Sequence, residues 1–174
     1  MTGLWGGGEK QERFVEKYLA ETPGYYTTGD AGFMDEDNYV YVMTRVDDVI
    51  NTAAHRLSTG QMEEVLNNHP AVIESSVIGK KDEIKGEVPF AFIVLSNDSK
   101  PSDELAKELN AKIRKDIGAI AKLEGVKFVS VLPKTRSGKI IRACIRQLVN
   151  DEPLKVPATI DDPSALDVIR EALK

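Results

Sequence analysis

The chain has 174 residues, of which 41% are hydrophobic and 29% are charged, so it is long enough for one ordinary core and part of another. Its formal net charge of −5 argues against a general nucleic-acid binder or a membrane-surface binder. A single cysteine, Cys144, excludes an intramolecular disulfide and fits a reducing compartment, and no apolar run reaches the roughly 20 residues that span a bilayer.

The first predicted elements are a helix and a hairpin. The opening residues MTGLWGGGEK lack the parts of a signal peptide and are typical of a loop inside a larger protein, so we expect a truncated start. Residues 9–20 place Phe14, Tyr18 and Leu19 at helical spacing. A strand over residues 38–43 follows an acidic turn, which predicts a hairpin over residues 25–43.

The remaining predicted elements form a small mixed set. Short extended pieces follow residue 46, and a helix begins at Thr59 and ends before His69–Pro70, because a residue before proline resists the helical conformation. An amphipathic helix begins after Ser102, a plausible N-cap, and stops at Gly118. The other predictions are strands at residues 71–79, 88–95 and 126–132, a charged loop joining the first two, and a last helix at about 140–149.

This order predicts an α+β domain in which helices cover a short sheet. The residues before it look like the end of a different unit, with the boundary near Asp47–Asp48. Charge supports the division, since residues 112–146 hold ten basic and two acidic side chains while residues 1–46 hold four basic and eight acidic ones. The basic charge therefore belongs to the second unit.

The stretch PKTRSGKIIR (133–142) has the composition of a phosphate site. It is not a P-loop, because Pro133 stands where the first glycine is required and Ile140 follows Lys139 in place of a hydroxyl residue. Gly138 allows a flexible turn from which Lys139 extends a charge towards an anionic group. Taken alone, SGK more often marks a solvated turn that starts a helix.

Two further motifs are weak when taken singly. YYTTGD (25–30) places Asp30 after a turn, where a carboxylate could accept hydrogen bonds from two neighbouring ribose hydroxyls. RVDDV (45–49) places Arg45 two residues before an Asp pair, so Arg45 could bind phosphate or ribose. An ordinary turn and a structural salt bridge are the simpler interpretations.

In this order and spacing, GYYTTGD…TRVDDVIN…HR…PKTRSGKIIR resembles the C-terminal region of the adenylate-forming superfamily, and within it the short-chain acyl-CoA synthetases, which make acetyl- and propionyl-CoA. The resemblance covers nearly the whole chain, including the tail DDPSALDVI. It implies that residues 1–46 end the large N-terminal adenylation domain and that residues 47–174 form the mobile C-terminal domain of AMP-binding enzymes.

The resemblance also implies roles for single residues. Family members join a carboxylate to ATP, and the C-terminal domain then swings so that CoA attacks the acyl carbon. Lys139 would be the catalytic adenylation lysine, Asp30 would hold the ribose hydroxyls, and Arg45 would help to fix the nucleotide. Asp47 would be the hinge.

Further residues correspond to the second half-reaction. Arg56 would approach the AMP phosphate after the swing, and Arg114 would contact CoA phosphates. Ala53 and Ala54 stand where the family usually has Ser-Gly beside the CoA pantetheine tunnel. The additional Cβ of Ala54 would narrow that tunnel, so we expect thioester formation to suffer more than adenylation.

A cation is implied near the sequence NNHPAV (67–72), where carbonyls at a helix end lack partners. Asn67, His69 and Val72 occupy the matching positions. The simpler interpretation of His69 is a cap on the C-terminus of the helix.

The implied function is that of a short-chain acyl-CoA synthetase that uses ATP, Mg²⁺ and CoA on a small carboxylic acid such as acetate or propionate. Most of the ATP site lies upstream in the family, so we expect this chain alone to be inactive and to need an N-terminal domain of the same enzyme. A lysine acetyltransferase and deacetylase could act on Lys139. No nucleic acid or membrane partner is expected, and the compartment would be the cytoplasm or the mitochondrial matrix. The alternatives are an enzyme that loads a carrier protein and a non-catalytic module that binds nucleotide, CoA or a protein partner.

Overall fold

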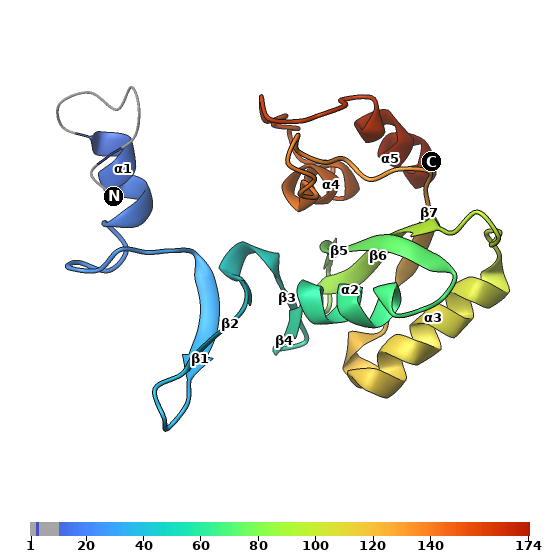
Figure 1. The fold of residues 1–174 in the computed structure, drawn as a ribbon, viewed down its shortest axis with the longest axis horizontal. Helices are drawn as coiled ribbons and strands as arrows, with labels where there is room; N and C mark the ends of the chain where they lie inside the picture. Colours follow the sequence, from blue (N-terminus) through green and yellow to red (C-terminus); the bar gives the residue numbers. More distant parts are fainter. Residues whose placement is uncertain (1–2, 4–10) are drawn as a thin grey trace. The chain divides into compact units, whose positions relative to one another are not determined.

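The computed structural model describes residue 3 and residues 11–174, and the chain divides into two compact units (Figure 1). Unit 1 ends at Asp47, and unit 2 runs from Asp48 to Lys174. Within the described residues, no helix has both the length and the apolar character needed to cross a membrane. The first two residues of the predicted helix at 9–20 lie outside the described part of the chain.

Unit 1 contains a short helix, α1 (Glu12–Tyr18), and an antiparallel hairpin of β1 (Asp30–Met34) and β2 (Val40–Arg45). The Asp35 carboxylate closes the hairpin turn by accepting the N–H groups of Asp37 and Tyr39. The predicted hairpin is confirmed, but its first strand begins only at Asp30 and its second strand runs from Val40 to Arg45. A short 3₁₀ turn, η1 (Val46–Asp48), then leads out of the unit.

Unit 2 is built on a five-stranded sheet in which β6 (Gly86–Leu95) is the central strand. It pairs antiparallel with β5 (Val72–Asp82) and with the end of β3 (Val49–Thr52), and parallel with β7 (Gly125–Phe128). The hairpin partner of β3 is β4 (His55–Ser58). The helical elements are α2 (Thr59–Asn67), α3 (Asp103–Asp116), η2 (Ala119–Ala121), α4 (Arg142–Val149) and α5 (Ala165–Leu173). The predicted α+β class is confirmed.

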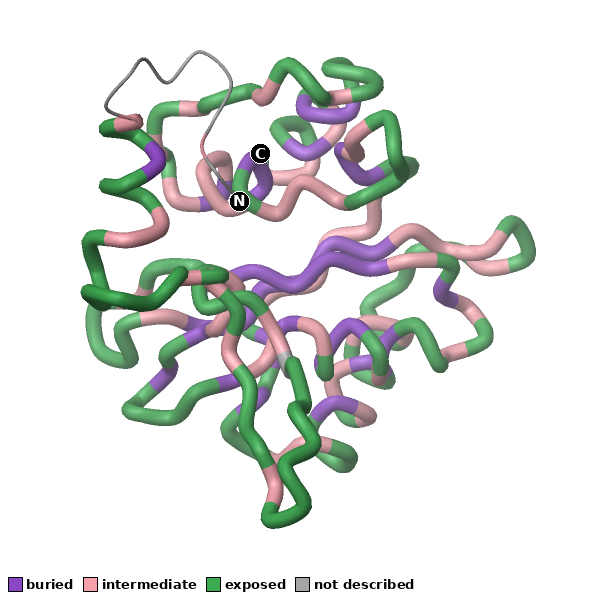
Figure 2. The backbone as a smooth tube through the Cα atoms, turned by 60° about the vertical axis from the view of Figure 1, so that its left-hand side comes forward, coloured by how far each residue is buried: buried purple, intermediate pink, exposed green. Residues whose placement is uncertain are grey.

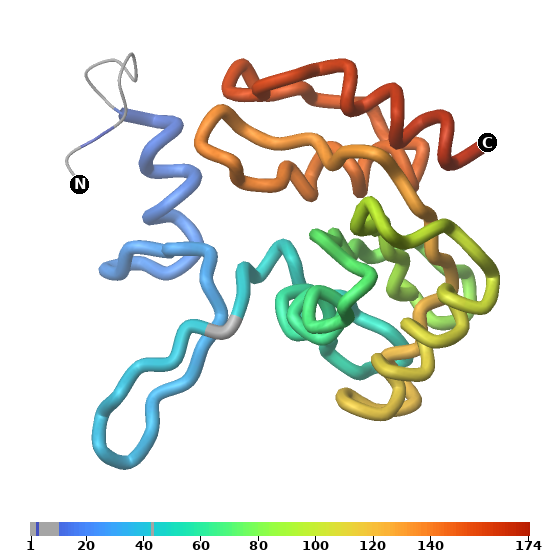
Figure 3. Tube along the Cα trace, turned by 45° about the vertical axis from the view of Figure 1, so that its right-hand side comes forward, coloured from blue at the N-terminus to red at the C-terminus, as the bar shows by residue number. Residues whose placement is uncertain are grey.

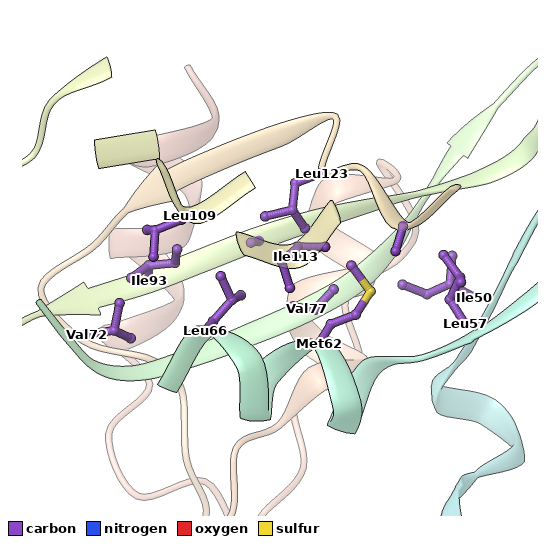
Figure 4. Close-up of a cluster of buried hydrophobic side chains, with 12 residues drawn as sticks. Ile50, Leu57, Met62, Leu66, Val72, Val77, Ile93, Leu109, Ile113 and Leu123 are labelled. Carbon is purple, nitrogen blue, oxygen red and sulfur yellow. The ribbon is translucent and has the colours of Figure 1, made fainter. Parts of the chain in front are cut away.

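The alternation of side chains along the strands supplies two hydrophobic clusters. On β6, Ala91 and Ile93 join one cluster while Phe90 and Phe92 join the other. The first cluster contains side chains from α2 and α3, such as Met62, Leu66, Leu109 and Ile113 (Figure 4). The second contains side chains from α4 and α5. Figure 3 traces the backbone of these two helices close together, in orange and red. Figure 2 shows the buried stretches of β5 and β6 running side by side between these layers.

Serine caps set the starts of two helices in unit 2. The Ser58 hydroxyl accepts the Gln61 N–H at 3.4 Å, and the Ser102 hydroxyl accepts the Leu105 N–H at 3.1 Å. Each bond satisfies an N–H that has no partner inside the helix. The prediction that Ser102 is an N-cap is confirmed, and α2 ends before His69–Pro70 as expected.

Two sequence-based boundaries were wrong. The strand predicted at 126–132 ends at Phe128, because the chain then leaves the sheet edge and buries Leu132 in the second cluster. The loop predicted between residues 79 and 88 shrinks to residues 83–85, because β5 continues through its charged end and the Asp82 carboxylate closes the turn.

Helix α5 was not predicted, although a signal was present. Leu166, Ile169 and Leu173 follow helical spacing, and Leu166 and Ile169 are buried. This segment contains the stretch DDPSALDVI, which contributes to the family resemblance. Helix α5 packs with α4 over the sheet, so it completes the layer beside the PKTRSGKIIR stretch.

Candidate functional site

Lys139 lies at the end of a tight turn that Thr135 holds together. The Thr135 N–H donates to the Lys139 carbonyl at 2.8 Å, and the Thr135 hydroxyl accepts the Lys139 N–H at 3.2 Å. The Thr135 carbonyl accepts the Gly138 N–H, and Gly138 has φ of 83°, a conformation that glycine adopts without strain. The turn thus presents an exposed Lys139 on a hydrogen-bonded frame.

A second segment of unit 2 supports this turn from the side. The Arg136 N–H donates to the Thr159 carbonyl, and its guanidinium donates to the Ala158 carbonyl at 2.8 Å. The Asp161 N–H donates to the Lys134 carbonyl. The chain between α4 and α5 therefore holds Lys134 and Arg136 in place. These residues form the first arm of the turn that carries Lys139, which we call the lysine turn.

Arg142, three residues after Lys139, makes a group of ionic contacts that sequence reasoning missed. Its Nε donates to Glu63 Oε1 at 2.8 Å, its Nη2 pairs with Glu63 Oε2, and its Nη1 lies 3.5 Å from Asp48 Oδ2. Glu63 is a buried residue of α2, and its Oε1 also accepts the Val77 N–H of β5 at 2.9 Å. The hydrogen bonds to Glu63 raise the pKa of Arg142 above its usual value.

In unit 1, three of the predicted site residues form one ion-paired cluster. Arg45 Nε donates to Asp47 Oδ1 at 3.1 Å, and its Nη1 lies 3.5 Å from Asp30 Oδ1. The same Nη1 donates to the Thr28 carbonyl at 3.0 Å. Gly29 has φ of 78°, and a Cβ there would lie 2.9 Å from Arg45 Nη2, so the glycine leaves room for the guanidinium. The structure thus brings together Asp30, Arg45 and Asp47.

Ala53 and Ala54 are the two loop residues of the β3–β4 hairpin. Both have positive φ, of 45° and 66°, as a two-residue hairpin turn of type I′ requires. Glycine and asparagine suit such positions, whereas alanine is strained there. A glycine at position 54 would therefore relieve this local strain.

The two predicted phosphate-contacting arginines lie on different elements of unit 2. Arg56 is exposed on β4, directly after this turn, and faces Asn51 of β3 in the strand register. Arg114 is exposed in the last turn of α3, where a cation interacts favourably with the helix dipole. Lys139, on a third element, is also exposed, so each of the three cations is open to a ligand from outside.

At the end of α2, where the resemblance implies a cation, the side chains of Asn67 and His69 make internal hydrogen bonds. Asn67 Oδ1 accepts the Ser75 hydroxyl at 2.8 Å, and His69 Nδ1 accepts the Ala71 N–H at 3.2 Å. His69 Nε2 then carries the proton and donates to Glu108 at 3.2 Å. The Val72 N–H donates to the His69 carbonyl. The described part of the chain has no group of three or more His, Cys, Asp or Glu residues that could hold a metal ion. The cation implied at the carbonyls near Asn67, His69 and Val72 stays a prediction.

The class of protein follows from comparison with known families. Residues 61–139, which include most of α2, the sheet strands β5 to β7, and Lys139, match the family of AMP-binding enzyme C-terminal domains. This part of the chain is therefore similar to the AMP-binding enzyme C-terminal domain. This assignment agrees with the observed sheet and its covering helices.

Particular relatives narrow the class. Mouse mitochondrial acyl-CoA synthetase short-chain family member 3 is 48% identical over 174 residues, covering 99% of this chain and 25% of its own length. The acetyl-coenzyme A synthetase of Pyrobaculum aerophilum is 44% identical over 170 residues, covering 98% of this chain and 25% of its own length. The crystal structure of Brucella canis acyl-CoA synthetase matches 71% of this chain and 23% of its own, with 38% identity and a TM-score of 0.57.

These relatives confirm the predicted resemblance to the C-terminal region of the short-chain acyl-CoA synthetases, in the adenylate-forming superfamily. The chain spans about a quarter of the length of the curated relatives it matches.

Proposed function

We propose that this chain is the C-terminal portion of an ATP-dependent short-chain acyl-CoA synthetase, which converts a carboxylate, ATP and CoA to acyl-CoA, AMP and pyrophosphate. The observation that carries the proposal is the exposed Lys139 on its braced turn, in a chain 48% identical to a short-chain acyl-CoA synthetase. Unit 1 would end the large adenylation domain, and unit 2 would be the mobile C-terminal domain. The rest of the adenylation domain would be its partner.

Lys139 would supply positive charge to the first half-reaction. A carboxylate oxygen must approach the α-phosphorus of ATP, and these two anionic groups repel each other. An ammonium group between them would lower that repulsion and stabilise the charge that builds in the transition state. Acetylation of Lys139 would remove the charge and stop this step, so an acetyltransferase and a deacetylase would regulate it.

The unit 1 cluster would serve the nucleotide. Asp30 would accept hydrogen bonds from the ribose hydroxyls, while Arg45 holds its carboxylate in place from 3.5 Å. Asp47, bonded to the same guanidinium, would be the hinge between the two conformations of the enzyme. The Arg45 contacts would therefore connect nucleotide binding to the hinge.

The second half-reaction would use the other exposed cations. Arg56 would approach the AMP phosphate, and Arg114 would pair with phosphates of CoA, since a guanidinium binds phosphate through two parallel hydrogen bonds. The Ala53–Ala54 turn would border the path of the pantetheine arm. Mg²⁺ would accompany the phosphates of ATP, because it favours phosphate oxygens and water. No step is assigned to a cation at the end of α2.

The substrate would be a small carboxylate, with acetate and propionate as the first candidates, because the relatives include an acetyl-coenzyme A synthetase and several short-chain acyl-CoA synthetases. The mitochondrial designation of the mouse relative supports the matrix as a location, and the cytoplasm is the other candidate.

The test is a hybrid synthetase, in which residues 1–174 replace the matching region of the mouse relative. The expected result is formation of acetyl-CoA or propionyl-CoA that depends on ATP and CoA, with little activity from the 174-residue chain alone. An inactive but folded hybrid would contradict the proposal. So would tight binding of ATP or CoA by the chain alone, because it would indicate an independent binding module.

A further inference from the structure

The Arg142 guanidinium joins three separate parts of unit 2. It lies at the first residue of α4, forms a bidentate pair with Glu63 of α2, and reaches Asp48, the residue directly after the proposed hinge. The Glu63 side chain is 8% exposed and the Arg142 side chain 24%. The pair is therefore largely withdrawn from water.

Stability alone does not explain a pair of this kind. Removing a carboxylate and a guanidinium from water is costly, and apolar side chains of similar volume often replace such pairs without loss. A bidentate guanidinium pair, in contrast, fixes both the distance and the orientation of the groups it joins. Glu63 is itself fixed, since its Oε1 also accepts the Val77 N–H of β5.

The pair is placed where it can determine the position of Lys139. The two arms of the lysine turn meet where the Ile141 N–H donates to the Pro133 carbonyl at 2.9 Å. On the first arm, Lys134 pairs with Glu74 of β5 at 2.6 Å. On the second arm, Arg142 pairs with Glu63. Both arms are thus held by ion pairs to the adjacent elements β5 and α2.

We propose that Arg142 and Glu63 are positioning residues for Lys139: their ion pair sets the second arm of the lysine turn on α2 and so aims the Lys139 ammonium for the adenylation step. The inference rests on the proposed function of Lys139. The Arg142 guanidinium also contacts Asp48, the residue directly after the proposed hinge. One guanidinium therefore holds both the lysine turn and the first residue of unit 2.

The experiment uses the hybrid synthetase with the double substitution Glu63→Gln and Arg142→Met. The amide oxygen introduced at position 63 can still accept the Val77 N–H, and the buried charge of Glu63 is removed together with that of Arg142. Only Asp48, whose side chain is partly exposed, loses a cation at 3.5 Å, so the melting temperature should change little. The rate constant of adenylation, followed by ATP–pyrophosphate exchange, should fall about tenfold or more, because small misplacements of a reacting group are costly. The KM for ATP and thioester formation from supplied acyl-adenylate should change less than about twofold.

A matched control removes another ion pair of unit 2. Lys81 pairs with Glu152 at 2.7 Å, and Lys81→Met with Glu152→Gln should leave the adenylation rate unchanged. A double variant at positions 63 and 142 that is folded and adenylates at the parent rate would overturn the proposal. If that variant unfolds, Arg142→Lys decides, since it keeps the charge and loses the bidentate geometry; a parent-like adenylation rate would again overturn the proposal.

A hybrid that makes no adenylate even before substitution would refute the proposed function and not the positioning geometry. In that case, amide hydrogen exchange of the 174-residue chain tests the positioning role without any activity measurement. The Ile141 and Lys139 amides, bonded to Pro133 and Thr135, should lose protection in the double variant. Unchanged protection would overturn the positioning role.

Discussion

At the turn between β3 and β4, two alanines occupy backbone conformations that favour glycine. Ala53 and Ala54 have φ of 45° and 66°, where the Cβ crowds the following carbonyl. The Ala53 N–H donates to the Lys85 carbonyl at 2.9 Å, so a neighbouring turn fixes this conformation. The strain is local, and it lies beside the path proposed for CoA.

Ala54→Gly should therefore stabilise the chain by about 1 kcal/mol, which raises the melting temperature by about 2–4 °C. Thermal unfolding followed by circular dichroism measures the change. Ala111→Gly is the matched control: Ala111 is exposed on α3 with ordinary helical geometry, so glycine there should destabilise by about 1 kcal/mol. A destabilising effect at position 54 would mean that the turn is not strained as described.

At the scale of elements, a charged contact links the β5–β6 turn to the entry of β7. Lys85 Nζ donates to Glu124 Oε1 at 2.8 Å, and Lys122 Nζ donates to Glu124 Oε2 at 3.3 Å. These lysines, Lys85 above all, hold the pKa of Glu124 below its usual value of 4.5, and Glu124 in turn raises the pKa of Lys85. The pairing favours the charged form of both partners.

The sign of these shifts predicts the pH dependence of stability. A carboxyl whose pKa is lower in the folded protein contributes stability above its unfolded pKa, and the contribution is lost as the pH falls through the folded value. Glu124→Gln should lower the melting temperature near neutral pH, and the effect should become smaller as the pH is lowered towards about 3. Glu83→Gln, at an exposed carboxylate of the same turn, is the matched control and should leave the melting temperature near neutral pH close to the parent value. An equal effect of Glu124→Gln at both pH values would contradict the ion-pair explanation.

The elements with strong local signals were the ones that could be predicted. Helices α2 and α3 combine serine caps with apolar periodicity, and β5 and β6 are apolar runs, so local chemistry decides their structure. The end of β7 depends on where Leu132 finds burial, which only the tertiary packing shows. The ion pair between Arg142 and Glu63 could not be predicted either, because the two residues lie 79 positions apart in the sequence.

The residues of the candidate site were predicted from the resemblance to a known family more than from the physical chemistry of the single motifs. Lys139, Asp30 and Arg45 stand in motifs that are weak singly and specific together. The structure added their surroundings: the Thr135 frame, the Arg45 cluster and the two ion-paired arms of the lysine turn. The salt bridge of Arg45 was the simpler interpretation of its motif and is confirmed by the contact with Asp47, whereas the other contacts could not be predicted from spacing alone.

For the molecule as a whole, the proposal requires unit 2 to rotate about Asp47 between the half-reactions. Asp47 lies in the 3₁₀ turn that connects β2 with unit 2, and its carboxylate pairs with Arg45. A hinge needs a few backbone dihedrals that can change while the packed units stay intact. A substitution that restricts one dihedral should therefore separate the two half-reactions.

Asp47→Pro in the hybrid synthetase should have this effect, because proline fixes φ near −65°. Pyrophosphate exchange and thioester formation from acyl-adenylate should fall by unequal factors, with a difference of at least about tenfold. Asp47→Ala is the control, since it removes the pair with Arg45 and leaves the backbone free. If the alanine variant separates the half-reactions as strongly as the proline variant, the effect belongs to the ion pair, and Asp47 is not the hinge.

The central claim, that Lys139 is the adenylation lysine, is tested most directly by ATP–pyrophosphate exchange in the hybrid synthetase carrying Lys139→Ala. Lys155→Ala, at another exposed lysine of unit 2, is the matched control and should retain the exchange. The predicted result is loss of exchange in the Lys139 variant with thioester formation from supplied acyl-adenylate preserved, because the charge is needed only while carboxylate and phosphate combine. Retained exchange, or an equal loss of both half-reactions, would contradict the role assigned to Lys139.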